Sequence, residues 1–143
     1  MGKPQEALGL FEKGFNCAQS VLGALGPDAG LDKEIGLGMA GSFGGGMARR
    51  GETCGAVTGA LMVLGLRHAM VREEDAQAKN KNYAEAEKFM EDFKKLHGSL
   101  VCRDLLGCDI STPEGSKAAG ERKLFSTLCP GFVRSAAEIL EKK

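Results

Sequence analysis

The sequence predicts an all-α fold, a single-domain bundle over residues 1–143 with about six to eight helices around a buried apolar helix at about residues 53–69. A chain of 143 residues is long enough for one domain with its own hydrophobic core. Ala, Leu, Met, Glu and Lys are frequent, and no stretch shows the period-two alternation of β-branched residues that indicates a strand. Glycine and proline divide the chain into segments of helical length.

Three helices are expected in the first 42 residues. The first covers about residues 4–13 and ends at Gly14. The second follows Asn16, a favourable N-cap, and continues through CAQSVLGAL. The third begins after Asp32 and runs to about Ser42.

The segment at about residues 53–69 is apolar nearly all round, which is typical of a helix that is buried on every side. Gly55 and Gly59 are four residues apart and therefore share one face of this helix. We interpret them as residues that let another helix backbone approach closely.

The second half of the chain predicts a long helix over about 72–98, a short helix in SLVCRDLLG and a final helix from Pro130 to about Glu141. Gly98 is expected to end the long helix. STPEGSKAAGE, residues 111–121, is expected to be irregular. The inward-facing residues are expected to be Tyr83, Ala86, Phe89, Met90, Phe93 and Leu96 on the long helix, and Phe132, Val133, Ala136, Ile139 and Leu140 on the final one.

Charge and hydropathy exclude several classes of function. The 19 basic residues balance 19 acidic ones, so no overall field favours nucleic acid or an anionic membrane. The longest strongly apolar run, residues 56–66, is too short to cross a bilayer. The first residues lack the apolar core of a signal peptide. We therefore expect a cytoplasmic protein without a nucleic-acid partner or membrane insertion.

The chain has five cysteines, which in a reducing compartment indicate metal or redox chemistry more than structural disulfides. Four of them fall in the opening turns of four different predicted helices. They are Cys17 after Asn16, Cys54 after Thr53, Cys102 within the turn that follows Ser99, and Cys129 before Pro130.

This placement predicts reactive sulfurs. The first turn of a helix presents unbonded N–H groups and the positive end of the helix dipole, so we expect lowered thiol pKa values. If the four helix starts converge, their thiolates suit an iron–sulfur cluster or zinc. If only two approach each other, they form a redox dithiol, with Cys54, close to Arg49 and Arg50, as its nucleophile.

The glycine-rich segment GSFGGGMARRGE, residues 41–52, is expected to supply backbone N–H donors to an anionic centre. It lacks the Gly-Lys-Ser/Thr of a phosphate-binding loop, and no strand precedes it as a dinucleotide fingerprint requires. No nucleotide cofactor is therefore expected. His68 and His97 are isolated and are expected to be surface or helix-end residues.

Four segments form a multi-part motif: GFNCAQSVL, GSFGGGMARRGETCGAVTGALMVLGL, CRDLLGCDISTPEG and CPGFVRSAAEIL. Together they resemble the C_GCAxxG_C_C family of redox-active proteins, from about Phe11 to Leu140. CGAVTG, residues 54–59, matches the CGAxxG element of the family. The signature cysteines of the family fall on the four helix-start cysteines, which leaves Cys108 as an accessory thiol.

A related domain of the split-Soret cytochromes is associated with an iron–sulfur centre of the two-iron, two-sulfur type. No haem is implied, because this chain lacks a CxxCH motif.

From these residues and the resemblance we expect a small redox protein that transfers electrons through an iron–sulfur cluster bound by Cys17, Cys54, Cys102 and Cys129. An electron carrier that serves an unidentified redox partner protein is favoured over a stand-alone enzyme, and nothing in the sequence excludes a homo-oligomer. Two alternatives stay open. One is a thiol–disulfide redox protein that uses a pair of the same cysteines. The other is a structural zinc or partner-binding helical protein, although zinc ligands usually come in close pairs such as CxxC.

Overall fold

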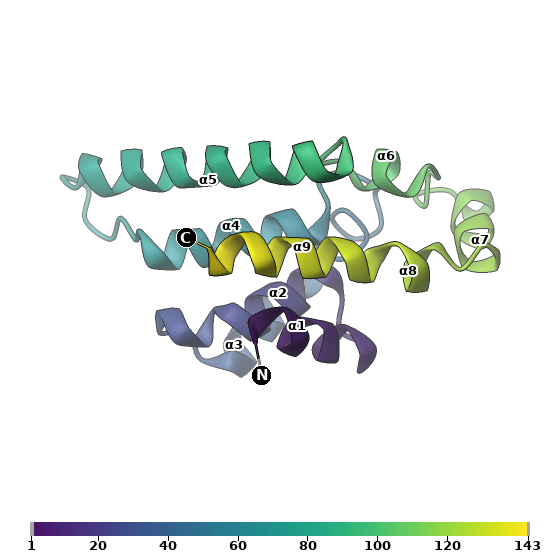
Figure 1. Ribbon diagram of the computed structural model, residues 1–143, viewed down its shortest axis with the longest axis horizontal. Helices are drawn as coiled ribbons and strands as arrows, with labels where there is room; N and C mark the ends of the chain where they lie inside the picture. The colour runs from purple at the N-terminus through teal and green to yellow at the C-terminus, as the bar shows by residue number, and fades with distance from the viewer. Residues whose placement is uncertain (1, 143) are drawn as a thin grey trace.

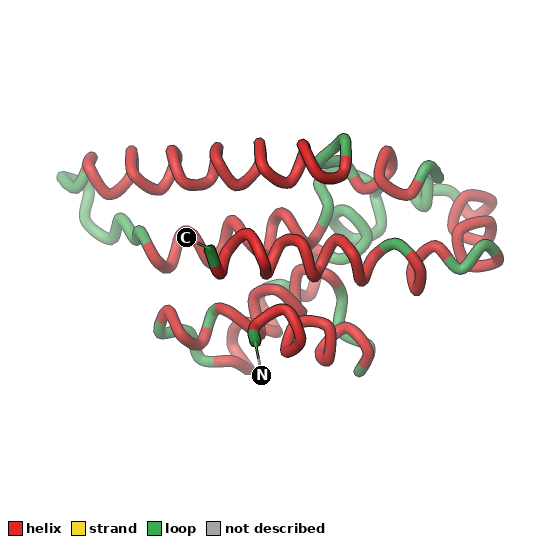
Figure 2. Tube along the Cα trace, in the orientation of Figure 1, coloured by secondary structure: helices red, strands yellow, loops and turns green. Residues whose placement is uncertain are grey.

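The computed structural model describes residues 2–142, and within them it contains α-helices and two short 3₁₀ segments but no β-strand. Figure 2 shows these helices joined by loops. The predicted all-α bundle is therefore confirmed. The elements are α1 (Lys3–Glu12), α2 (Cys17–Leu25), η1 (Pro27–Ala29), α3 (Lys33–Met39), η2 (Gly41–Phe43), α4 (Gly55–Arg67), α5 (Ala76–His97), α6 (Cys102–Leu106), α7 (Pro113–Glu121), α8 (Leu124–Thr127) and α9 (Cys129–Glu141).

The helices lie in layers, as Figure 1 shows. The long helix α5 lies on one side, α4 and α9 lie in the middle, and α1, α2 and α3 lie on the opposite side. The short helices α6, α7 and α8 form one end of the molecule. Helix α4 packs against α2, α5 and α9, and every residue from Gly55 to Leu66 is buried or half-buried, so the predicted central helix is confirmed. Within residues 2–142, no helix combines the length and the apolar character that a bilayer span requires.

Helix α2 begins where its capping residues place it. The Asn16 side chain accepts a hydrogen bond from the Gln19 backbone N–H at 2.8 Å, and the Gln19 side chain accepts one from the Asn16 N–H at 3.0 Å. This reciprocal capping box satisfies two N–H groups that the helix itself leaves unbonded. It makes Cys17 the first residue of α2.

Helices α2 and α4 approach each other closely, as the two glycines of α4 predict. A Cβ atom at Gly59 would lie 2.8 Å from the Ala18 backbone oxygen, and one at Gly55 would lie 2.9 Å from the Ala18 nitrogen. Backbone atoms at these distances leave no room for a side chain. The interpretation of Gly55 and Gly59 as packing residues is confirmed.

Residues 111–121 do not form the irregular segment that we expected. They contain α7, whose N-cap Thr112 accepts a hydrogen bond from the Gly115 N–H through its side-chain oxygen at 2.9 Å. Pro113 follows at the first helical position, where its missing N–H costs nothing. This local capping stabilises a helix whose two glycines had indicated a loop.

The buried stripe of α5 is narrower than its sequence pattern predicted. Phe89 and Phe93 are fully buried, but Tyr83 is 65% exposed and Leu96 is 63% exposed. The stripe ends on His97 instead of Leu96, because the His97 ring packs edge-on against Phe132 of α9, with 5.0 Å between ring centroids. The expectation that Tyr83 and Leu96 face inward is therefore wrong.

This packing predicts a pH dependence of folding. Burial lowers the pKa of His97 below its ordinary 6.5, because removal of water disfavours the charged imidazolium. The unfolded chain therefore takes up the proton first as the pH falls, and protonation favours unfolding until the lower folded pKa is reached. We expect the free energy of unfolding of the metal-free protein, measured with urea, to fall between about pH 7 and pH 5. The slope should shrink in His97→Gln and persist in His68→Gln, and an unchanged slope in His97→Gln would contradict this prediction.

Candidate functional site

Four of the five cysteines begin four different helices. Cys17, Cys102 and Cys129 are the first residues of α2, α6 and α9, and Cys54 is the N-cap of α4. The predicted placement at helix starts is confirmed, with small differences in the caps. Cys54 itself, and not Thr53, caps α4, and α6 begins after Val101 and not after Ser99.

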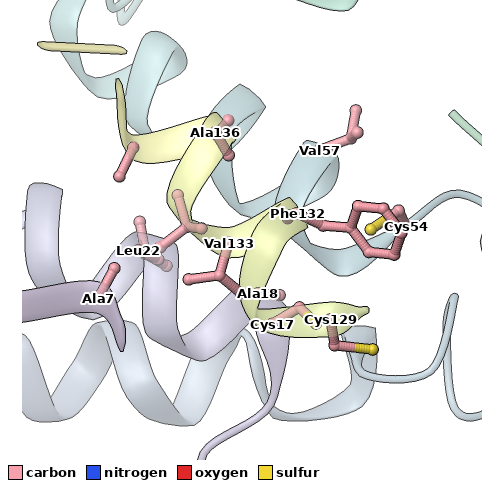
Figure 3. Packing of buried hydrophobic residues seen from close by; sticks show 14 of the residues in the cluster. Ala7, Cys17, Ala18, Leu22, Cys54, Val57, Cys129, Phe132, Val133 and Ala136 are labelled. Atoms are coloured by element: carbon pink, nitrogen blue, oxygen red, sulfur yellow. The ribbon is translucent and has the colours of Figure 1, made fainter. Parts of the chain in front are cut away.

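These four side chains line a single cavity of about 730 Å³. Each is at most 9% exposed, whereas Cys108 is half-buried and does not line the cavity. Figure 3 shows three of them, Cys17, Cys54 and Cys129, at the edge of the hydrophobic core close to Phe132. The segments that the sequence separates by up to 112 positions, 17 to 129, therefore meet at one place.

Side-chain and backbone contacts link the four cysteines. The Cys17 thiol acts as a hydrogen-bond donor to the Cys129 sulfur, so the starts of α2 and α9 are in contact. The segments that precede Cys54 and Cys102 run side by side in an isolated antiparallel bridge between Thr53 and Val101. Next to this bridge, the Cys54 N–H donates to the Leu100 oxygen at 2.8 Å and the Cys102 N–H to the Glu52 oxygen at 2.6 Å.

The arrangement of the four cysteines differs from a site for one metal ion. Among residues 2–142, no three Cys, His, Asp or Glu side chains are gathered closely enough to hold a single ion. A tetrahedral zinc site with Zn–S bonds of about 2.3 Å holds its sulfurs about 3.8 Å apart. Four cysteines that line one cavity without this close grouping fit a centre with two metal atoms better than a centre with one.

Burial dominates the pKa of Cys54 and Cys102. Loss of hydration raises the pKa of Cys54 to about 12. The N–H groups of Ala56 and Val57 at the start of α4 lower it, although neither has the geometry of a full capping hydrogen bond. Burial raises the pKa of Cys102 to about 11, against the opposing charge of Arg103.

The pKa values of Cys17 and Cys129 shift in opposite directions. The hydrogen bond that Cys17 donates to Cys129 is the larger cause that raises the pKa of Cys17, and burial is the next. The same hydrogen bond lowers the pKa of Cys129. The expected lowering at helix starts is therefore wrong for Cys17, Cys54 and Cys102. The helix start acts in the predicted direction at Cys54, but the protein interior removes more stabilising water than the first turn of the helix replaces.

The glycine-rich loop forms one wall of the cavity in an unusual conformation. Five consecutive residues from Gly45 to Arg49 have positive φ angles between 51° and 69°, and three of them are not glycine. Each non-glycine residue costs about 1–2 kcal/mol in this left-handed region. Hydrogen bonds across the loop hold it, among them Ala48 N–H to the Ser42 oxygen at 2.7 Å. A Cβ atom at Gly46 would lie 2.7 Å from that of Cys102, so this position accepts only glycine.

Three features of the site were not predicted from the sequence. The apolar wall that includes Phe11, Phe125 and Phe132 leaves no local pattern, because these residues come from three separate helices. The bridge between Thr53 and Val101 is too short to leave a periodic pattern. Arg49 is close to Cys54 in the sequence, but no local signal requires the two residues to line the same cavity, as they do.

The structure is thus a helical protein in which four buried cysteines line one cavity. The chain belongs to the C_GCAxxG_C_C family of redox-active proteins. The model of this family, described as "Putative redox-active protein (C_GCAxxG_C_C)", matches residues 15–143, so the predicted membership is confirmed. Comparisons with curated proteins and with solved structures find no match.

Proposed function

We propose that the protein carries electrons through a two-iron, two-sulfur cluster bound by Cys17, Cys54, Cys102 and Cys129. The observation that supports this proposal is the convergence of four cysteines from four helix starts on one cavity. A cluster of this type takes four cysteine thiolates, two on each iron. The contact between Cys17 and Cys129 and the bridge that adjoins Cys54 and Cys102 supply two such pairs.

The residues around the four cysteines stabilise added negative charge at the cavity. The cluster, when bound, supplies a one-electron couple. The starts of α2, α4 and α9 direct the positive ends of their dipoles toward the cysteines that begin them. The Arg103 side chain adds positive charge beside Cys102. Such surroundings stabilise the reduced state of a centre and raise its reduction potential.

A second candidate is a thiol–disulfide redox protein that uses Cys17 and Cys129. Their direct contact, and the lowered pKa of Cys129, favour this pair. The Cys129 thiolate would attack a disulfide of a partner protein and release one partner thiolate. The Cys17 thiolate would then displace the second partner sulfur, which leaves the Cys17–Cys129 disulfide and two reduced partner thiols. The raised pKa of Cys54 disfavours the sequence-based choice of Cys54 as the nucleophile.

Anaerobic purification and reconstitution with iron and sulfide distinguish these candidates. The cluster predicts two irons and two sulfides per chain, together with visible absorption that bleaches on one-electron reduction. A colourless protein without iron or sulfide after reconstitution would contradict the cluster. If that protein forms a Cys17–Cys129 disulfide reversibly, the thiol–disulfide function replaces it. Tightly bound zinc without a reducible centre would instead support a structural role.

A further inference from the structure

The cavity that contains the four cysteines is larger than a cluster requires. Its volume of about 730 Å³ lies within the range of small-molecule sites, which is about 300–1,000 Å³. A two-iron, two-sulfur core adds only four atoms to the cysteine sulfurs. Space for a second occupant therefore remains in the same cavity.

One wall of this space has unpaired positive and donor groups. Arg49 lines the cavity and makes no ion pair with any residue in 2–142. Gly45 and Gly46 line the same cavity, and no acceptor in that range takes a hydrogen bond from the N–H of either. Gly46 is buried, where an unbonded N–H is costly unless a ligand or water accepts from it. A guanidinium beside free backbone N–H groups matches a carboxylate.

Much of the remaining wall is apolar. Phe125 lines the cavity and is 37% exposed, so its ring is not fully covered by other residues of the protein. Aromatic rings and branched aliphatic side chains bury apolar ligand surface with a defined geometry. The apolar residues of this wall are Phe11, Leu105, Leu106, Ile110, Phe125 and Phe132.

We propose that the cavity binds a small carboxylic acid with an aromatic body, whose carboxylate contacts Arg49 and the N–H groups of Gly45 and Gly46 and whose body packs on Phe125 and Phe132. The protein then brings an organic anion next to its cysteine centre, which goes beyond the transfer of electrons between protein partners. The proposal rests on the proposed function in one respect, that the ligand shares the cavity with a cluster at the four sulfurs.

Calorimetric titration with three probes tests this proposal in both the cluster-containing and the reduced, metal-free protein. The probes are phenylbutyrate, its uncharged amide, and butyrate, which lacks the aromatic ring. We expect phenylbutyrate to bind about tenfold or more tightly than its amide, because a charged group that loses its partner forfeits at least that factor. We expect a similar margin over butyrate, because butyrate lacks the ring that buries apolar surface. Arg49→Gln should weaken phenylbutyrate binding by about the same factor, whereas the matched variant Arg50→Gln, at a neighbouring exposed arginine that does not line the cavity, should not.

Three results would overturn the proposal. They are no heat of phenylbutyrate binding at millimolar concentration in either form, equal affinity for the acid and its amide, or equal effects of Arg49→Gln and Arg50→Gln. Phe125→Ala should also weaken phenylbutyrate more than butyrate, because it removes only apolar contact. Iron content and visible absorption, recorded on the same samples, report on the cluster separately. A coloured protein that does not bind phenylbutyrate contradicts only the proposal of an organic ligand. A colourless protein that binds phenylbutyrate contradicts only the proposal of a cluster.

Discussion

Replacement of Cys17, Cys54, Cys102 or Cys129 with serine is expected to remove the cluster, with a fall of at least tenfold in the iron and sulfide retained after anaerobic reconstitution. A serine hydroxyl stays protonated near neutral pH and is a poor ligand for the irons that thiolates hold. Among the described residues that line the cavity, no His, Asp or Glu side chain is present to replace the missing ligand. Iron and sulfide assays and the visible spectrum measure this outcome.

Cys108→Ser is the matched control for this series. The Cys108 thiol donates to the Gly115 oxygen at 3.5 Å and does not line the cavity, so this variant should keep its full iron content and colour. Burial of a serine hydroxyl costs about 1–3 kcal/mol, and a second set of variants with alanine separates loss of the ligand from loss of folding. Helical circular dichroism should persist in both sets.

The same series distinguishes the two proposed functions. The cluster predicts that all four variants lose their reducible centre. The thiol–disulfide pair predicts a loss in Cys17→Ser and Cys129→Ser alone, because the hydrogen bond joins these two sulfurs. Full redox activity in the variants of Cys54 and Cys102 would therefore count against the cluster and in favour of the pair.

Local signals account for the features that the sequence predicted correctly. Asn16 fixes the start of α2 through its own side chain, and Gly98 ends α5 with a positive φ angle of 87° that suits glycine. The four helix-start cysteines follow from such signals, because a cap and the residue after it are neighbours in the chain. The convergence of these helix starts depends on tertiary packing, so local signals in the sequence do not determine it.

Tertiary packing decided the features that the sequence did not predict. The helix start at Cys54 lowers its pKa as expected, yet burial raises it to about 12, and burial depends on which other helices cover the sulfur. The exposure of Leu96 depends in the same way on where α9 lies against α5. Met47, Ala48 and Arg49 have a left-handed backbone conformation, which residues other than glycine disfavour. Only the folded loop as a whole can hold them in this conformation.

The close approach of α2 and α4 leads to the second large prediction. Gly59→Ala is expected to lower the free energy of unfolding of the reduced, metal-free protein by about 1–2 kcal/mol. Forcing a methyl group into a packed interface costs about 1–3 kcal/mol, and the better helix propensity of alanine returns about 0.5–1 kcal/mol of this cost. The methyl group would meet the Ala18 backbone oxygen at 2.8 Å and its Cα at 3.1 Å, and neither atom can move without the helix.

Gly65→Ala, in the same helix, is the matched control. A Cβ atom at Gly65 would meet only the flexible Asn82 side chain, at 3.9 Å, so this variant should gain the helix propensity without the clash. Urea unfolding should therefore separate the two variants by about 2 kcal/mol. Because Cys17 is the first residue of α2 and Cys54 is the N-cap of α4, a shift between these helices also separates their sulfurs. Gly59→Ala should bind less iron than Gly65→Ala, and equal stability and iron content in both would show that close packing of α2 on α4 does not position the cysteines.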